Sequence, residues 1–296
     1  SPLAAAADYI DVYYRFPLGE EGRSAAVRMP AMRARLGEQF PGTPLTTQIA
    51  RAEAFNQASR WNDLRAAYGE LLPQVSGAAR ERALLRIARA NVELGSGLVQ
   101  LLSLELTDPD LESERLYLIS QEYRSKNRES DMLETIELAV QKCPQCPATA
   151  DALFAAGNYF WTRLDRARAS DYYERVVAAA PAGPNASVAQ WRVIWTSYLA
   201  RNDVRDPIEA YLRRYPNSGY AVDALYFLGR ANERAGNMSH ARSMYLAAVQ
   251  VFPQTYFGGY AAGRLREIGS APINPAEFLT LFPAAGPLPS FNRAVP

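Results

Sequence analysis

The chain has 296 residues, 48% of them hydrophobic, and its 32 basic side chains nearly balance the 31 acidic ones. These apolar side chains are enough for a sizeable core, which excludes a disordered chain. The net charge of +1 disfavours nucleic acid or an anionic membrane as the partner, and no apolar run is long enough to span a bilayer. The chain starts at Ser1 without an initiator Met or an apolar leader, so we expect a mature or truncated chain that has lost any export signal.

Residues 1–30 are predicted to form an N-terminal helical cap, and a repeat array is predicted over residues 31–269. Prolines spaced 32 to 37 residues apart mark this array: Pro41, Pro73, Pro109, Pro144, Pro181, Pro216 and Pro253. Because proline cannot continue a helix and disfavours helical backbone in the residue before it, each is predicted to end one helix of a unit. A period of about 35 residues indicates a solenoid of helix pairs.

The predicted fold is therefore all-α: a right-handed superhelical solenoid of about seven antiparallel helix hairpins of the tetratricopeptide-like type. Residues 45–73 and 111–144 have the pattern of amphipathic hairpins, with apolar side chains at helical spacing. Residues 270–296 are rich in proline and are predicted to form an extended tail or linker.

The only two cysteines, Cys143 and Cys146, lie between two predicted helices, and a proline follows each of them. A zinc site needs about four ligands, which the single histidine, His240, cannot complete. A thioredoxin-like redox motif would follow a strand, and none is predicted here. A local disulfide or a pair of free thiols remains. We favour the disulfide, which indicates an oxidising compartment.

The two clearest units, residues 150–181 and 222–253, share small and aromatic residues at the same offsets. From the first glycine, an alanine follows after 12 residues, a tyrosine after 16 and a proline after 24; the two sets are Gly157, Ala169, Tyr173 and Pro181, and Gly229, Ala241, Tyr245 and Pro253. We expect the glycine and alanine to let the two helices of a hairpin approach closely. The tyrosine is predicted to fill the space between adjacent hairpins, and the proline to close the unit.

No catalytic, cofactor-binding or metal-binding residues are predicted in this chain. His240 lies at the start of a predicted helix, where a solvent-facing side chain is expected, and no glycine-rich phosphate-binding loop occurs. Most aromatic residues fall at packing positions of the repeat. Tyr13, Tyr14, Trp161 and Trp195 are the candidates for lining the inner surface of the superhelix, where stacked rings would suit sugars or peptides.

Residues 206–253 resemble the units of bacterial envelope tetratricopeptide proteins, which typically end in an aromatic residue and proline. Residues 252–269 are similar to the end of the superhelical region in soluble lytic murein transglycosylases. The family-like junction is centred on Tyr256, Phe257 and Gly258. The full set of matching residues is Phe252, Pro253, Thr255, Tyr256, Phe257, Gly258, Ala261, Ala262, Arg264 and Leu265.

This resemblance implies a non-catalytic scaffold that binds or positions peptidoglycan in the periplasm or at the outer membrane, while a lysozyme-like domain beyond Pro296 cleaves the glycan. The family's catalytic Glu-Ser pair is echoed at Glu129-Ser130, but no Gly-Leu-Met-Gln or Ala-Tyr-Asn motif follows it. None of the catalytic residues is therefore carried over. Two alternatives stay open: an envelope adaptor that binds a partner protein or peptide without enzyme activity, and a generic cytoplasmic tetratricopeptide module.

Overall fold

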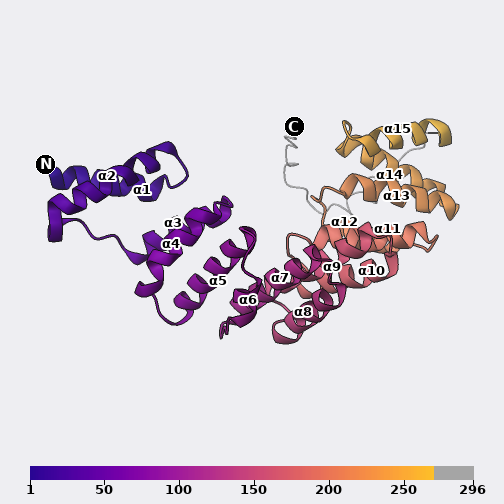
Figure 1. Ribbon diagram of the computed structural model, residues 1–296. Coiled ribbons are helices and arrows are strands. Elements are labelled where there is room, and N and C mark those ends of the chain that lie inside the picture. The colour runs from indigo at the N-terminus through magenta and orange to yellow at the C-terminus, as the bar shows by residue number, and fades with distance from the viewer. Residues whose placement is uncertain (270–296) are drawn as a thin grey trace. The chain divides into compact units, whose positions relative to one another are not determined.

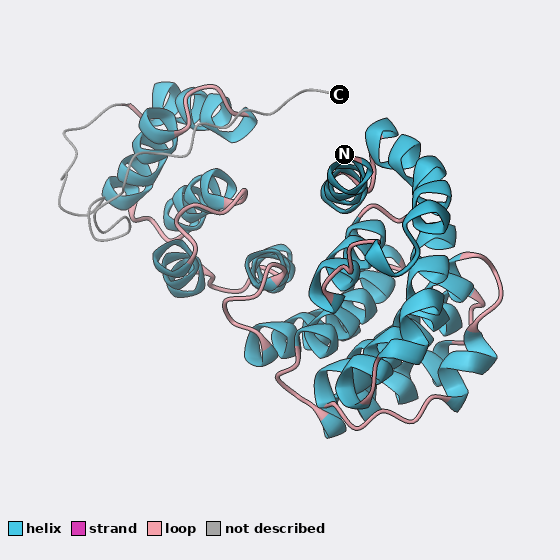
Figure 2. Cartoon of the chain, turned by 90° about the vertical axis from the view of Figure 1, so that its left-hand side faces the viewer, coloured by secondary structure: helices cyan, strands magenta, loops and turns pink. Residues whose placement is uncertain are grey.

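A computed structural model describes residues 1–269 as helices joined by short loops (Figures 1 and 2), and no strand occurs among these residues. The helices are α1 (Pro2–Arg15), α2 (Glu20–Leu36), α3 (Leu45–Gln57), α4 (Trp61–Leu71), α5 (Gly77–Glu93), α6 (Leu98–Ser103), α7 (Pro109–Ser125), α8 (Glu129–Lys142), α9 (Pro147–Thr162), α10 (Arg166–Ala179), α11 (Ala186–Leu199), α12 (Arg205–Arg214), α13 (Ala221–Arg234), α14 (Met238–Val251) and α15 (Tyr256–Ile268). Two 3-10 turns, Gly37–Gln39 and Leu72–Gln74, follow α2 and α4.

The chain divides into two compact units, Ser1–Thr149 and Ala150–Pro296. In the first unit, α1 packs on α2, α3 on α4, α5 on the short α6, and α7 on α8. In the second unit α10 packs on α11 and α13 on α14, and α15 covers α13 and α14. Helices adjacent in sequence are thus also neighbours in space, which confirms the predicted all-α solenoid of helix hairpins.

Most of the prolines lie where the repeat predicts them. Pro181, Pro216 and Pro253 each come two residues after the last residue of α10, α12 and α14. Pro109 is the exception, because it is the first residue of α7 and so opens a helix instead of closing one. Its missing N–H costs nothing at that position, and the preceding Asp108 caps the helix by accepting from the backbone N–H groups of Asp110 and Leu111.

The predicted boundary of the N-terminal cap, at residue 30, falls inside α2, which continues to Leu36. The cap is therefore a complete hairpin of α1 and α2, and the regular array starts with α3. The predicted tail, residues 270–296, lies outside the described residues.

The turns between the helices of six hairpins share one backbone feature. The second residue after the first helix has a positive φ: Ser59, Gly95, Asn127, Leu164, Arg201 and Gly236. The next N–H then donates back across the end of the helix; for example, Asp165 N donates to Phe160 O over 3.1 Å and Asn237 N to Asn232 O over 2.8 Å. Glycine adopts this conformation without strain, whereas Leu164 and Arg201 adopt it at a cost of about 1 kcal/mol each.

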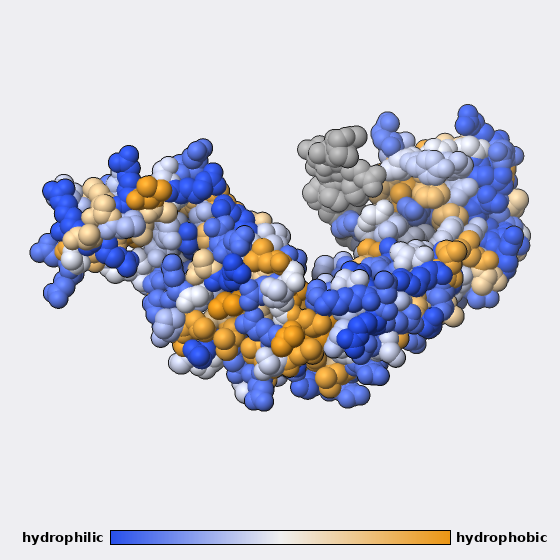
Figure 3. All heavy atoms as spheres, viewed as in Figure 1, coloured by the Kyte–Doolittle hydropathy of each residue, from blue (hydrophilic) through white to orange (hydrophobic). Residues whose placement is uncertain are grey.

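Apolar side chains fill the space between the helices of each unit. In the second unit the core includes the fully buried side chains of Tyr211, Leu225 and Tyr245, and in the first it includes Phe55, Leu64 and Tyr68. Some apolar side chains remain outside. Figure 3 shows them gathered over α5 and α6, where Val99 is 82% exposed.

Candidate functional site

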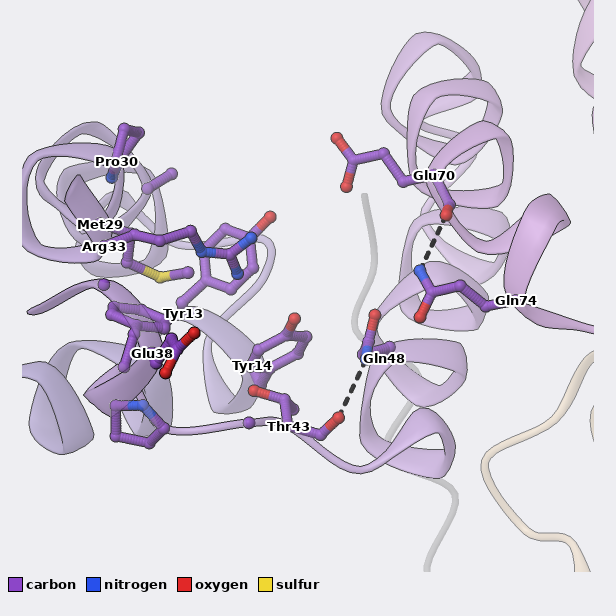
Figure 4. A pocket seen from close by; sticks show the side chains of 15 residues that line it. Tyr13, Tyr14, Met29, Pro30, Arg33, Glu38, Thr43, Gln48, Glu70 and Gln74 are labelled. Carbon is purple, nitrogen blue, oxygen red and sulfur yellow. Dashed lines mark hydrogen bonds between the residues drawn. The ribbon is translucent and has the colours of Figure 1, made fainter.

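A hollow in the first unit, here called the N-terminal cavity, has a volume of about 860 Å³. Figure 4 shows Tyr13, Met29 and Arg33 on one side, and Gln48, Glu70 and Gln74 on the other, with Tyr14 between them. The loop that connects the α1–α2 hairpin to α3 supplies Glu38 and Thr43 to the same cavity. Two of the four aromatic residues that the sequence marks as candidates, Tyr13 and Tyr14, thus line one cavity.

Polar groups around the cavity are fixed by their neighbours. The Gln48 side-chain amide donates to Thr43 O over 2.9 Å, and the Gln74 amide donates to Glu70 O over 2.9 Å. The Arg51 guanidinium stacks over the Tyr13 ring at 3.8 Å from the ring centroid. Burial raises the pKa of Tyr13 against the opposing effect of Arg51, so this hydroxyl stays protonated and can donate to a ligand.

The cavity combines apolar ring faces with hydrogen-bonding groups of both kinds. Arg33 supplies donors only, Glu38 and Glu70 supply acceptors, and the glutamine amides supply both. Positive and negative side chains occur together, so no strong net field favours an anionic or a cationic polymer. This arrangement suits a hydroxyl-rich or amide-rich ligand with an apolar face.

The repeat-defining residues meet within each hairpin. A Cβ atom added to Gly157 would lie 2.5 Å from the Tyr173 ring, and one added to Gly229 would lie 2.5 Å from the Tyr245 ring. The tyrosine is predicted to fill the space between adjacent hairpins; its ring lies on the glycine of its own hairpin. The glycine makes room for that ring. Ala169 and Ala241 are fully buried.

The hydroxyl of each of these tyrosines takes part in a set of hydrogen bonds that joins its hairpin to an arginine on the next helix. We call each such set an inter-hairpin clamp. The Tyr245 hydroxyl donates to Glu233 over 2.7 Å, and Arg264 donates to the other oxygen of Glu233 over 2.6 Å. Burial opposes the charge on Glu233, but these hydrogen bonds outweigh it and lower the pKa of this carboxyl.

Two more clamps repeat this arrangement. Tyr68 donates to Glu53 over 2.5 Å, and Arg86 donates to the same oxygen over 3.0 Å. Arg192 donates to both Asn158 and the Tyr173 hydroxyl. Arg192 and Arg264 lie 35 residues after Gly157 and Gly229, so each arginine occupies the position of that glycine in the helix that follows the hairpin, α11 or α15. The departure from the repeat at Arg192 is therefore a contact between hairpins, which the sequence pattern alone does not reveal.

The family-like junction forms the start of α15 and lines a second hollow, the C-terminal pocket, of about 570 Å³. Thr255 caps the helix by accepting from Gly258 N over 3.1 Å. A Cβ on Gly258 would lie 2.2 Å from Phe252 O, so the turn requires glycine there, whereas a Cβ on Gly259 would meet nothing within 4 Å. The close approach is thus to the preceding carbonyl and involves only the first glycine of the pair.

The aromatic residues of the junction differ in their roles. Phe257 packs on Tyr226 and Phe227, with ring centroids 5.2 and 5.3 Å apart. Tyr256 is 70% exposed, and its hydroxyl lies 2.9 Å from that of Tyr260. Phe257 therefore covers apolar side chains of α13, whereas Tyr256 faces solvent.

The two tryptophan candidates, Trp161 and Trp195, contact side chains of their own hairpin and of the next one. Trp161 stacks under the Arg166 guanidinium at 3.9 Å and meets the edge of Tyr173. Trp195 packs against Tyr198 and Phe227, with centroids 5.5 and 4.7 Å apart. Both are partly buried and serve as packing residues, and neither lines the two hollows described above.

Cys143 and Cys146 form a disulfide at the turn between α8 and α9. Asp110 and these two sulfurs are the one group of side chains in the described residues that clusters closely enough for a metal ion. Sulfurs held in a disulfide are not thiolate ligands, so this group does not suit a metal. His240 is exposed near the start of α14, as the sequence predicts.

No family model matches this chain, and no curated protein does. Among solved structures the chain is similar to BtubC from P. vanneervenii. The two share 14% sequence identity with a TM-score of 0.40, and the match covers 93% of this chain and 96% of BtubC. At that TM-score the likeness carries no argument about function. None of the helices between residues 1 and 269 has the length and apolar character needed to cross a membrane.

Proposed function

We propose that this chain is the non-catalytic superhelical scaffold of a periplasmic protein of the lytic transglycosylase type, and that its N-terminal cavity binds glycan strands of peptidoglycan. Cleavage would be the task of a lysozyme-like domain, and the scaffold would hold the substrate for it. The observation that carries the proposal is the composition of the N-terminal cavity, in which two tyrosine rings are surrounded by amide, carboxylate and guanidinium groups.

A sugar ring presents an apolar face of C–H groups and a rim of hydroxyls, and the sugars of peptidoglycan add amide side groups. Tyr13 and Tyr14 offer apolar ring faces with polar tips to such a ligand. Gln48 and Gln74 are oriented by bonds to backbone carbonyls, and their side-chain oxygens are left to accept from a ligand. The volume of about 860 Å³ lies in the range of ordinary ligand pockets, roughly 300–1,000 Å³.

Two further features support the compartment and the family. The Cys143–Cys146 disulfide is of a kind that persists in oxidising compartments such as the periplasm. The residues of the family-like junction have defined local roles, since Thr255 caps α15 and Gly258 admits the Phe252 carbonyl. The cap and the close approach explain why threonine and glycine are needed at these two positions.

The test is binding of the purified chain to peptide-free glycan strands prepared from sacculi with an amidase. Tyr14→Leu removes one ring of the cavity while keeping apolar bulk, and we expect affinity to fall at least about tenfold. The matched control is Tyr9→Leu, on the same helix, because Tyr9 does not line the cavity. Circular dichroism is the check that both variants keep their helices.

Equal binding by the natural chain and Tyr14→Leu would reject the cavity as the glycan site. No binding to glycan strands or to intact sacculi, together with capture of one defined envelope protein by the natural chain, would favour the adaptor alternative.

A further inference from the structure

The C-terminal pocket contains an acidic group that has no counter-charge. Ser218, Val222 and Asp223 line it from the start of α13, and the turn from Val251 to Phe257 lines it from the other side. Asp223 is the only charged residue in this lining. Three other carboxylates of the second unit have cationic partners: Asp165 pairs with Arg168, Asp203 with Arg205, and Glu233 with Arg264.

Asp223 makes no ion pair in the described part of the chain. Burial raises its pKa to about 6, and the only opposing effect is a hydrogen bond with its own backbone. Partial burial of an unpaired carboxylate costs free energy, so a ligand that supplies a positive charge would recover that cost.

The lining around Asp223 is mostly apolar and includes aromatic residues. Tyr256 and Phe257 belong to it, and Val222 and Val251 add aliphatic surface. A cation is attracted both to a carboxylate and to the faces of aromatic rings, whereas an aliphatic stem is favoured by the apolar walls. The pocket volume of about 570 Å³ is sufficient for one long side chain and its surroundings.

We propose that the C-terminal pocket binds a primary ammonium group on an aliphatic stem, as in the side chain of lysine or a related diamino acid, with Asp223 accepting from the ammonium and Tyr256 and Phe257 flanking it. This inference does not depend on glycan binding at the N-terminal cavity. It assigns the exposed Tyr256 a role in ligand binding that its position in the fold does not require.

Binding should weaken as the solution becomes acidic enough to protonate Asp223. Two other titratable groups lie close to it, the hydroxyls of Tyr211 on α12 and Tyr256 on α15. Both have a raised pKa, so both stay neutral from pH 5 to pH 8. The lining residue from α14, Val251, does not titrate. The pH dependence therefore reports Asp223 alone.

The test uses Nα-acetyl-lysine methylamide as the probe and its Nε-acetylated form as the neutral control, with binding measured by NMR titration of the whole chain at pH 7.5. We expect the charged probe to bind and the neutral one to bind at least about tenfold more weakly. Asp223→Asn should lose binding by a similar factor. Asp151→Asn should keep it, because Asp151 is also partly buried with a raised pKa but bonds Asn185 outside this pocket.

A second readout is independent of any variant. The bound ammonium should lower the pKa of the Asp223 carboxyl from about 6, as followed by carbon NMR of that group. Equal binding of the two probes, unchanged binding by Asp223→Asn, or an unchanged Asp223 pKa at saturating probe would each overturn the proposal.

Discussion

Replacing one glycine of the Gly258-Gly259 pair should disturb the fold, and replacing the other should not. The Cβ of Gly258→Ala would lie 2.2 Å from Phe252 O and 3.2 Å from its carbonyl carbon. These are backbone atoms, so they cannot move aside as a flexible side chain would. In Gly259→Ala the new methyl group meets nothing within 4 Å.

The magnitudes follow from these contacts. An overpacked methyl group costs about 1–3 kcal/mol, and shifting the first turn would also weaken the Thr255 cap, which contributes about 1 kcal/mol. Both variants gain about 1 kcal/mol of helix propensity. We therefore expect Gly258→Ala to destabilise α15 by roughly 1–3 kcal/mol and Gly259→Ala to stabilise it by up to about 1 kcal/mol.

Native-state hydrogen exchange of peptides that cover residues 252–268 measures the stability of this segment directly, because a helix at the end of an array can open locally. A loss of 1.4 kcal/mol speeds exchange about tenfold in this assay. Equal exchange in the two variants, or faster exchange in Gly259→Ala, would refute the assignment of the close approach to Gly258.

Three further outcomes are expected from urea unfolding followed by circular dichroism. Leu164→Gly should stabilise the second unit by about 1 kcal/mol, because Leu164 is 74% exposed and has a φ of 64°, which glycine adopts without strain. Gly236→Leu should destabilise the unit by a similar amount. If Leu164→Gly destabilises the unit, the turn geometry is contradicted. Arg264→Gln should cost about 1–3 kcal/mol at pH 7, since it removes the closer of the two cations of the Glu233 side chain, which is only 10% exposed, and leaves Arg230 at 3.6 Å. Glu267→Gln should cost little, because the Glu267 side chain is 62% exposed. Folding lowers the pKa of Glu233, so the difference in stability between the natural chain and Arg264→Gln should be present above about pH 4.5 and shrink as the pH falls further. A stability difference that does not depend on pH would count against the clamp. Asp223 should have the opposite effect on stability, because folding raises its pKa from an ordinary 3.8 to about 6. The free energy of unfolding should fall by roughly 1–2 kcal/mol, allowing for solvent screening, as the pH rises from 4 to 7. Asp223→Asn should remove that fall.

The helix hairpins were predictable because proline and helical periodicity act locally. The Gly157–Tyr173 and Gly229–Tyr245 pairs were visible as matching offsets, although their geometry was not. Periodicity reports which residues are spaced alike and does not report which surfaces those residues touch. Pro109 shows the same limit, because proline fits equally well just after one helix and at the first position of the next.

The candidate sites were less predictable, for a physical reason. The N-terminal cavity joins residues from Tyr13 to Gln74 that no short motif connects. The unpaired state of Asp223 is equally invisible in the sequence, where it resembles any other acidic residue near the start of a helix. Arg192 departs from the repeat at the glycine position, but the sequence does not show that this side chain contacts Asn158 and Tyr173 of the preceding hairpin.

Glycan binding at the N-terminal cavity is tested by hydrogen exchange of the whole chain with and without peptide-free glycan strands. We expect slower exchange in the segments that line the N-terminal cavity, residues 10–16, 26–48 and 70–74, and unchanged exchange in α7 and α8. Unchanged exchange in those three segments at saturating glycan, or protection confined to other helices, would contradict glycan binding at this cavity.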